Sequence, residues 1–109
     1  MIPTGVSLIV TIVNKGYADT VMEAAREAGA SGGTVLHARG TGTLEAEKIF
    51  GIAIEPEKDL LLILTGDEKR PDIMKAVYRE TGLSTGGMGI CFSLPVEDLL
   101  GTSIKLPQA

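Results

Sequence analysis

Runs of apolar residues with two different periods divide the first half of the chain into strand, helix and strand. Residues 6–13 read VSLIVTIV, and this run of β-branched residues predicts a central strand. From Tyr17 to Ala28 the apolar positions recur every three or four residues, as in an amphipathic helix, and Gly29 is expected to end it in a left-handed conformation. The run from Gly33 to Ala38 predicts a second strand, which we expect to be buried.

The second half of the chain predicts strand, helix and strand again. Apolar residues between positions 52 and 64 predict a third strand region, in which Pro56 marks a break or an edge because proline cannot donate to a ladder. Pro71 suits the first turn of a second helix. The apolar face of that helix is expected to hold Ile73, Met74, Val77 and Tyr78. Residues 90–94 predict a fourth strand, and residues 96–100 predict one more helical turn.

The predicted element order is β-α-β-β-α-β, which is typical of the ferredoxin-like α+β fold. In that fold an antiparallel sheet carries two helices on one face. With 109 residues we expect one domain spanning residues 1–109. Apolar side chains on the sheet face without helices would need another cover, so the pattern favours self-association. The fold alone does not identify a function, because it hosts many.

Composition narrows the possible partners and the compartment. A net charge of -4 and an aromatic content of 4% argue against nucleic acid, which needs clustered cations or stacking rings. The single cysteine, Cys91, cannot form an intrachain disulfide, which suits a reducing compartment. The chain begins without a charged, signal-like segment, and its apolar runs are far shorter than the roughly 20 residues that span a bilayer. We therefore expect a cytoplasmic protein.

Two glycine-rich segments stand at strand ends, one at residues 40–42 and one at residues 86–89. Consecutive N–H groups in such segments can cradle an anion, but the same glycines could simply permit tight turns, and the sequence leaves both interpretations open. Arg39 precedes the first segment, and its guanidinium could bind a phosphate or carboxylate. An ordinary surface or intersubunit ion pair is an equally good interpretation of this arginine.

Nothing in the sequence assembles a catalytic site. The only histidine, His37, has no metal-ligating residue at ligand spacing, so a structural role is favoured. Cys91 is interpreted as a small buried apolar residue rather than a nucleophile. Five carboxylates fall in loop or turn sequence and are interpreted as solvated: Glu45, Glu47, Glu55, Glu57 and Asp59. We expect no enzymatic activity, no catalytic residues, no metal site and no cofactor.

The run from Ala24 to Gly42, AAREAGASGGTVLHARGTG, resembles the helix and second strand of the PII signalling proteins, trimeric regulators of nitrogen metabolism. The similarity continues through residues 50–52 and 55–58, the second helix, and residues 89–97. The resemblance implies a homotrimer of ferredoxin-like subunits, with sheets packed around a threefold axis and adenine nucleotides bound between subunits. The implied role is regulation of a nitrogen-metabolism enzyme or a membrane transporter.

The same resemblance implies two sets of functional residues. The ligand, AMP, ADP or ATP, would contact Thr34, Arg39, Gly40, Thr41, Gly42, Gly86, Gly87, Met88 and Gly89. A loop whose shape depends on the bound ligand would reach the partner protein, and it would include Thr43, Leu44, Glu45, Ala46, Glu47, Lys48, Ile49 and Phe50.

Several positions depart from the family pattern. The loop lacks the tyrosine that is modified in classical members, so nucleotidylation is not expected. Met88 stands near the place of a phosphate-binding lysine, and Gly101 and Ser103 stand near two arginines. A polyphosphate would therefore lose most of its cationic partners. The resemblance is closer to the divergent PII-like group, whose members are often paired with membrane transport proteins. Two alternatives stay open, a ligand-independent trimeric adaptor and a divalent-metal-handling protein of similar architecture.

Overall fold

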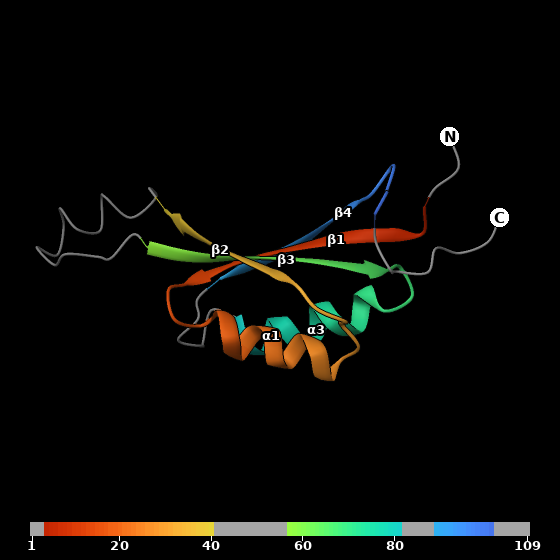
Figure 1. Cartoon of the computed structure of the whole chain (residues 1–109). Coiled ribbons are helices and arrows are strands. Elements are labelled where there is room, and N and C mark those ends of the chain that lie inside the picture. The colour runs from red at the N-terminus through yellow and green to blue at the C-terminus, as the bar shows by residue number, and fades with distance from the viewer. Residues whose placement is uncertain (1–3, 41–56, 82–88, 102–109) are drawn as a thin grey trace, which may run out of the picture.

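Four strands and two helices make up the part of the chain that the computed structural model describes, residues 4–40, 57–81 and 89–101. In chain order they are β1 (Val6–Asn14), α1 (Ala18–Glu27), β2 (Thr34–Arg39), β3 (Glu57–Gly66), α3 (Arg70–Thr81) and β4 (Ile90–Pro95). The predicted βαββαβ order and the α+β fold class are confirmed. Both helices lie on one side of a single sheet (Figure 1).

The sheet is antiparallel throughout, with strand order β2-β3-β1-β4. β1 is therefore an inner strand, as predicted, while β2 and β4 form the two edges. The register places Leu60 of β3 opposite both Leu36 of β2 and Ile12 of β1, and Ile12 opposite Ile90 of β4. Residues that share such a row project from the same face of the sheet.

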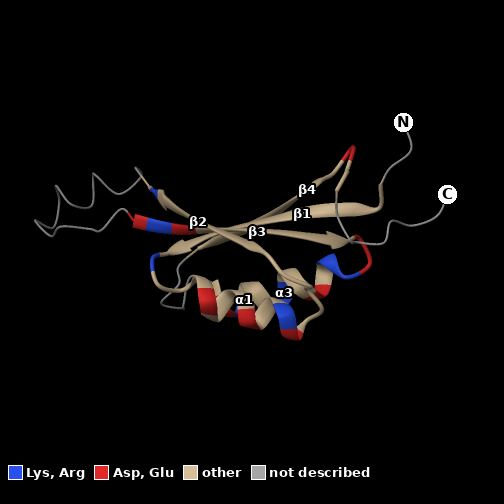
Figure 2. Cartoon of the chain, viewed as in Figure 1, with Lys and Arg blue, Asp and Glu red and all other residues tan. Residues whose placement is uncertain are grey.

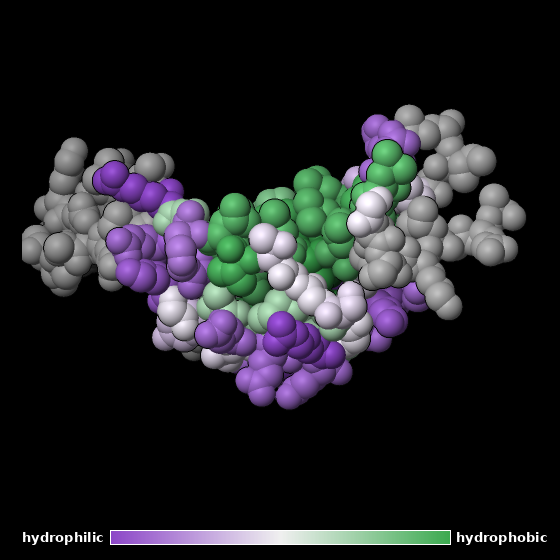
Figure 3. All heavy atoms as spheres, viewed as in Figure 1, coloured by the Kyte–Doolittle hydropathy of each residue, from purple (hydrophilic) through white to green (hydrophobic). Residues whose placement is uncertain are grey.

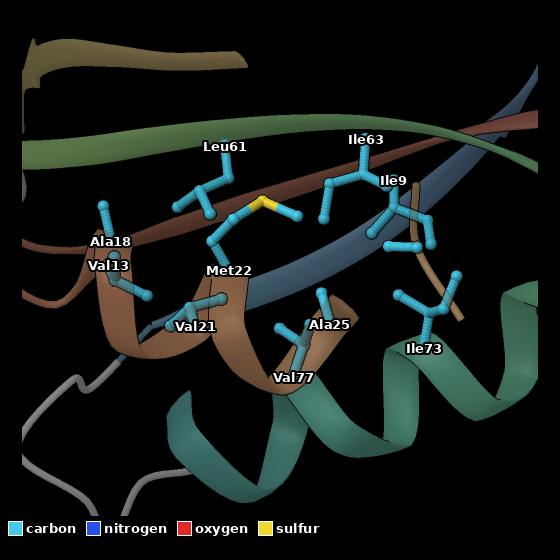
Figure 4. Close-up of a cluster of buried hydrophobic side chains, with 11 residues drawn as sticks. Ile9, Val13, Ala18, Val21, Met22, Ala25, Leu61, Ile63, Ile73 and Val77 are labelled. Atoms are coloured by element: carbon cyan, nitrogen blue, oxygen red, sulfur yellow. The ribbon is translucent and has the colours of Figure 1, made fainter. Parts of the chain in front are cut away.

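The core lies between the helices and one sheet face (Figure 4). Alternate strand residues face the apolar stripes of both helices, and the residues at these positions are aliphatic. The fully buried apolar strand residues of this core are Ile9, Val13, Leu61 and Ile63, and they pack against Val21, Met22, Ala25, Ile73 and Val77 of the helices. Neither helix in the described ranges is long and apolar enough to cross a membrane.

Two glycines fix how the chain passes from α1 into β2. Gly29 has φ 117, so the helix ends in the positive-φ conformation that the sequence predicts. At Gly33 an added Cβ would stand 2.9 Å from Met22 Sδ and 3.1 Å from Ile63 Cγ1. β2 can therefore approach the core closely only because position 33 has no side chain.

Three predictions about local structure are wrong. All six residues of β2 are exposed in the single chain because it is an edge strand beyond the cover of the helices. The predicted turn at residues 96–100 is not helical, since Val96 N–H bonds to Val6 O and continues the extended path beside β1. Tyr78 is 68% exposed, because the buried stripe of α3 passes through Ile73 and Val77, as predicted, and through Ala76 rather than Tyr78.

Candidate functional site

The side chains at the two ends of β2 belong to opposite faces of the sheet. Thr34 begins the strand and is the register partner of Leu62, whereas Arg39 ends it opposite Glu57. The two positions are five residue steps apart, which corresponds to about 16 Å along a strand. Within one chain these two predicted ligand residues are thus not brought together, although both are exposed.

Gly89, another predicted ligand residue, lies at the other edge of the sheet. It immediately precedes β4 and contacts β1, where an added Cβ would stand 2.8 Å from Val13 Cγ1. Since β3 and β1 lie between β4 and β2, Gly89 is separated from the Arg39 end of β2 by about 14 Å. Both positions nevertheless lie at the same end of the sheet, where β1 finishes at Asn14.

Most of the other predicted site residues fall outside the described ranges. Among the ligand residues only Gly40 remains, and it follows Arg39 directly. Thr41, Gly42, Gly86, Gly87 and Met88 lie outside the described residues, as does the whole predicted partner loop from Thr43 to Phe50. Their assignments stay predictions.

Charged residues gather where β2 ends and β3 begins (Figure 2). Arg39 and Glu57 are register partners, and Lys15 Nζ lies 2.8 Å from Glu57 Oε2. His37 and Asp59 form the next pair inward. We name these five residues the charged end: Lys15, His37, Arg39, Glu57 and Asp59. Any anion that approaches Arg39 also meets Glu57, so this end of the sheet is not a simple cationic pocket.

Asp59 is the buried member of the charged end, with 4% of its surface exposed. Its Oδ2 accepts the Gly16 N–H at 3.0 Å, and its Oδ1 lies 3.0 Å from His37 Nδ1. Burial alone would raise the pKa of Asp59. Hydrogen bonds from Gly16, from His37 and from the Ala18 N–H outweigh it and hold the pKa below the usual 3.8.

The prediction that Asp59 belongs to a solvated loop is therefore wrong. The acidic sequence before it hides that β3 already begins at Glu57. Since residues of β3 alternate between faces, position 59 falls on the helix side, behind the β1–α1 turn. The pairing with His37 was missed because 22 residues separate the two, and only the strand register brings them together.

Cys91 and the acidic residues offer little further chemistry in the described part of the chain. Burial raises the pKa of the Cys91 thiol, and the hydrogen bond from Thr11 Oγ1, at 3.5 Å, opposes this only partly. A protonated thiol is a poor nucleophile. Within residues 4–40, 57–81 and 89–101, no group of three or more His, Cys, Asp and Glu could hold a metal ion.

The sheet face away from the helices is apolar across all four strands. We call it the open face, and its residues are Leu8, Val10, Ile12, Leu36, Leu60, Leu62, Leu64, Ile90, Phe92 and Leu94. Four of them are 40% to 60% exposed: Leu36, Ile90, Phe92 and Leu94. Figure 3 shows the hydrophobic surface gathered over the sheet and the hydrophilic surface over the helices. An apolar surface of this kind marks an interaction site.

Comparisons with known proteins agree on one family. The family model "Nitrogen regulatory protein P-II" matches residues 6–103. Among solved structures, PII from Arabidopsis thaliana bound to citrate is 18% identical, with a TM-score of 0.69 over 96% of this chain and 88% of that chain. A PII-like signalling protein from Thermus thermophilus is 20% identical, with a TM-score of 0.64 over 84% of this chain and 86% of that chain. No curated protein sequence matches the chain.

Proposed function

Because the chain belongs to the nitrogen regulatory protein P-II family, we propose that it is a homotrimeric signalling regulator that binds a small anionic ligand between its subunits. Proteins of this family are regulators rather than enzymes. The family match over residues 6–103 is the observation that carries the proposal. The target would be an enzyme of nitrogen metabolism or a membrane transporter, and the protein would act in the cytoplasm.

The open face supports self-association. Rows of apolar side chains cross the sheet, such as Leu36, Leu60, Ile12 and Ile90, and the helices cover only the opposite side. Burying apolar surface contributes roughly 25 cal/mol per Å², so covering these rows with identical rows of other copies would stabilise an assembly. Closed rotational symmetry lets every copy bury its own open face in this way.

The positions of the predicted ligand residues favour a site shared between copies. Arg39 and Gly40 lie at one edge of the sheet and Gly89 at the other, about 14 Å apart. In a closed ring, the β2 edge of one copy can meet the β4 edge of the next. The first edge would then supply the paired guanidinium donors that a phosphate or carboxylate requires. At the second edge the Gly89 N–H already bonds to Thr81 O, so any donors there would have to come from the predicted ligand residues that precede it.

The ligand that we propose is an adenine nucleotide, AMP, ADP or ATP. The PII protein of Arabidopsis thaliana was crystallised with citrate, so a small polycarboxylate, which is also an anion, is a second candidate. Glu57 lies beside Arg39, and position 88 holds a methionine where a lysine would bind phosphate. Both features would disfavour ATP, which carries the most negative charge of the three nucleotides, so we expect AMP or ADP.

Two measurements on the full chain test this function. Light scattering should give a mass of about 34 kDa, three times the 11.4 kDa chain. A ligand present at 100 times its Kd should stabilise the fold by about 2.7 kcal/mol in thermal unfolding. We expect such stabilisation with AMP or ADP. A trimer that responds to no nucleotide and no citrate would instead support the adaptor function, and a monomer would refute the proposal.

A further inference from the structure

The Arg39 end of edge strand β2 is tied to β3 by a side-chain contact between two titratable groups. His37 Nδ1 lies 3.0 Å from Asp59 Oδ1, and the two residues are register partners. The His37 side chain is 85% exposed, while that of Asp59 is 5% exposed. Protons from solvent therefore reach the imidazole directly, whereas the carboxylate lies inside the fold.

Asp59 is a fixed partner in this contact. Its other oxygen accepts the Gly16 N–H at 3.0 Å, and the Ala18 N–H also donates to the carboxylate. These donors belong to the turn before α1 and to its first residue, which is packed into the core. The carboxylate is thus held by the β1–α1 connection. When the contact between the two side chains breaks, His37 and its edge strand are therefore the parts that move.

Other charged residues belong to the elements around this contact. Glu57 and Lys15 form an ion pair of 2.8 Å, and Arg39 lies two residues from His37 on the same face of β2. The first turn of α1 adds Asp19, which is exposed. Carboxylates, lysine and arginine do not change charge between about pH 5 and pH 8, whereas histidine does.

The two states of His37 differ in how strongly they hold β2. A neutral imidazole with its proton on Nδ1 can still donate to Asp59, but the bond is then between a neutral donor and a carboxylate. A protonated imidazole makes a charge-assisted bond between two ions, which is shorter and stronger. It also balances the buried negative charge of Asp59, which the neutral form leaves less compensated.

We propose that His37 and Asp59 form a proton-operated latch, in which the protonated imidazole holds the Arg39 end of β2 against β3 and deprotonation loosens it. The latch goes beyond the proposed function, because it requires no ligand. If Arg39 does bind the ligand, the latch would also make ligand affinity fall as the pH rises, and only that consequence rests on the proposed function.

Amide hydrogen exchange of the full chain tests the latch without any nucleotide. After correction for intrinsic exchange rates, those amides of residues 36–39 that donate to β3 should be roughly three- to tenfold better protected at about pH 5.5 than at about pH 7.5. Residues 34 and 35, at the other end of β2, should not change. The light-scattering mass must be the same at both pH values. Equal protection of residues 36–39 at both would overturn the proposal.

Variants separate the latch from a merely structural role of His37. His37→Gln never carries a charge and should show the weaker protection at both pH values, while His37→Arg always carries one and should show the stronger. Lys58→Gln is the matched control, because Lys58 contacts Asn14 from the opposite face of β3, at 2.7 Å. It should keep the wild-type pH dependence. Retention of that dependence in His37→Gln would also overturn the proposal.

Discussion

Gly89 lies so close to β1 that a side chain at this position would overlap the carbonyl oxygen of Ile12. The glycine N–H also donates to Thr81 O at 2.9 Å, which ties the end of α3 to the start of β4. Position 89 therefore has a packing role that is independent of any ligand. This matters because Gly89 is also one of the predicted ligand residues.

We expect Gly89→Ala to destabilise the fold by roughly 1–3 kcal/mol, because the added methyl group must displace the main chain of β1. Urea unfolding followed by circular dichroism measures the change. Gly32→Ala is the matched control, since a Cβ there has nothing within 4 Å and should alter the free energy of unfolding by less than about 0.5 kcal/mol. Equal stability of both variants would show that β4 can move away from Ile12.

The open face predicts a clear effect on assembly. Phe92 is 40% exposed in the middle of the β4 edge of this face, so Phe92→Asp would place a charge where another copy should pack. We expect the mass in light scattering to fall from about 34 kDa to the 11.4 kDa of one chain.

Tyr78→Asp provides the comparison on the helix side. Tyr78 is more exposed than Phe92, at 68%, but it belongs to α3, away from the open face. This variant should keep the wild-type mass. If both variants, or neither, change the mass, the open face is not the contact between copies.

Sequence periodicity predicted both helices and all four strands of the described residues, because a run of β-branched and apolar residues or a helical spacing is a local feature. It could not predict that β2 is an exposed edge, since Val35 and Leu36 read as buried residues in any strand order. Strand order depends on pairing between distant segments. Local pattern does not encode that pairing.

The same limit explains the candidate site. His37 was interpreted as structural, and Asp59 was assigned to a loop, because neither residue has a partner nearby in sequence. Their contact follows from the pairing of β2 with β3 and from the alternation of faces. The resemblance of the Ala24 to Gly42 run to PII proteins was informative for another reason: it reports a shared ancestry rather than a physical periodicity.

Acid should remove the stabilisation that Asp59 provides. Because the pKa of Asp59 is lower in the folded protein than its usual 3.8, the unfolded chain binds the proton more readily. The contribution is thus present above the unfolded pKa and is lost as the pH falls through the folded pKa, below about 4.

Asp59→Asn tests this linkage. We expect a loss of roughly 1–3 kcal/mol at pH 7, since an amide cannot replace a carboxylate that accepts several hydrogen bonds. In urea unfolding series at different pH values, the difference in free energy of unfolding between wild type and variant should narrow below about pH 4. Parallel curves would show that Asp59 has the same pKa folded and unfolded.

The thiol of Cys91 should react slowly in the folded protein. Burial raises its pKa, so the fraction of thiolate at neutral pH is below that of a free cysteine. We expect labelling by a chromogenic disulfide reagent to be at least about tenfold slower than in the unfolded chain. Glu97→Cys in a Cys91→Ser background gives the exposed control, because residue 97 is solvent-exposed. Equal rates at both positions would contradict the protection expected from the partial burial of Cys91.

Arg39 is the described residue on which the ligand proposal depends most. Arg39 is the exposed last residue of β2. A guanidinium that binds phosphate or carboxylate contributes roughly 1.5–3 kcal/mol to the binding free energy. Arg39→Ala should therefore weaken AMP or ADP binding in calorimetry by about tenfold to a hundredfold, without changing the mass of the assembly. Arg26→Ala removes an exposed arginine from the last turn of α1 and should leave the affinity unchanged. Because both variants remove one positive charge, a net-charge effect would weaken binding equally in the two, and only a selective loss in Arg39→Ala places this guanidinium at the ligand.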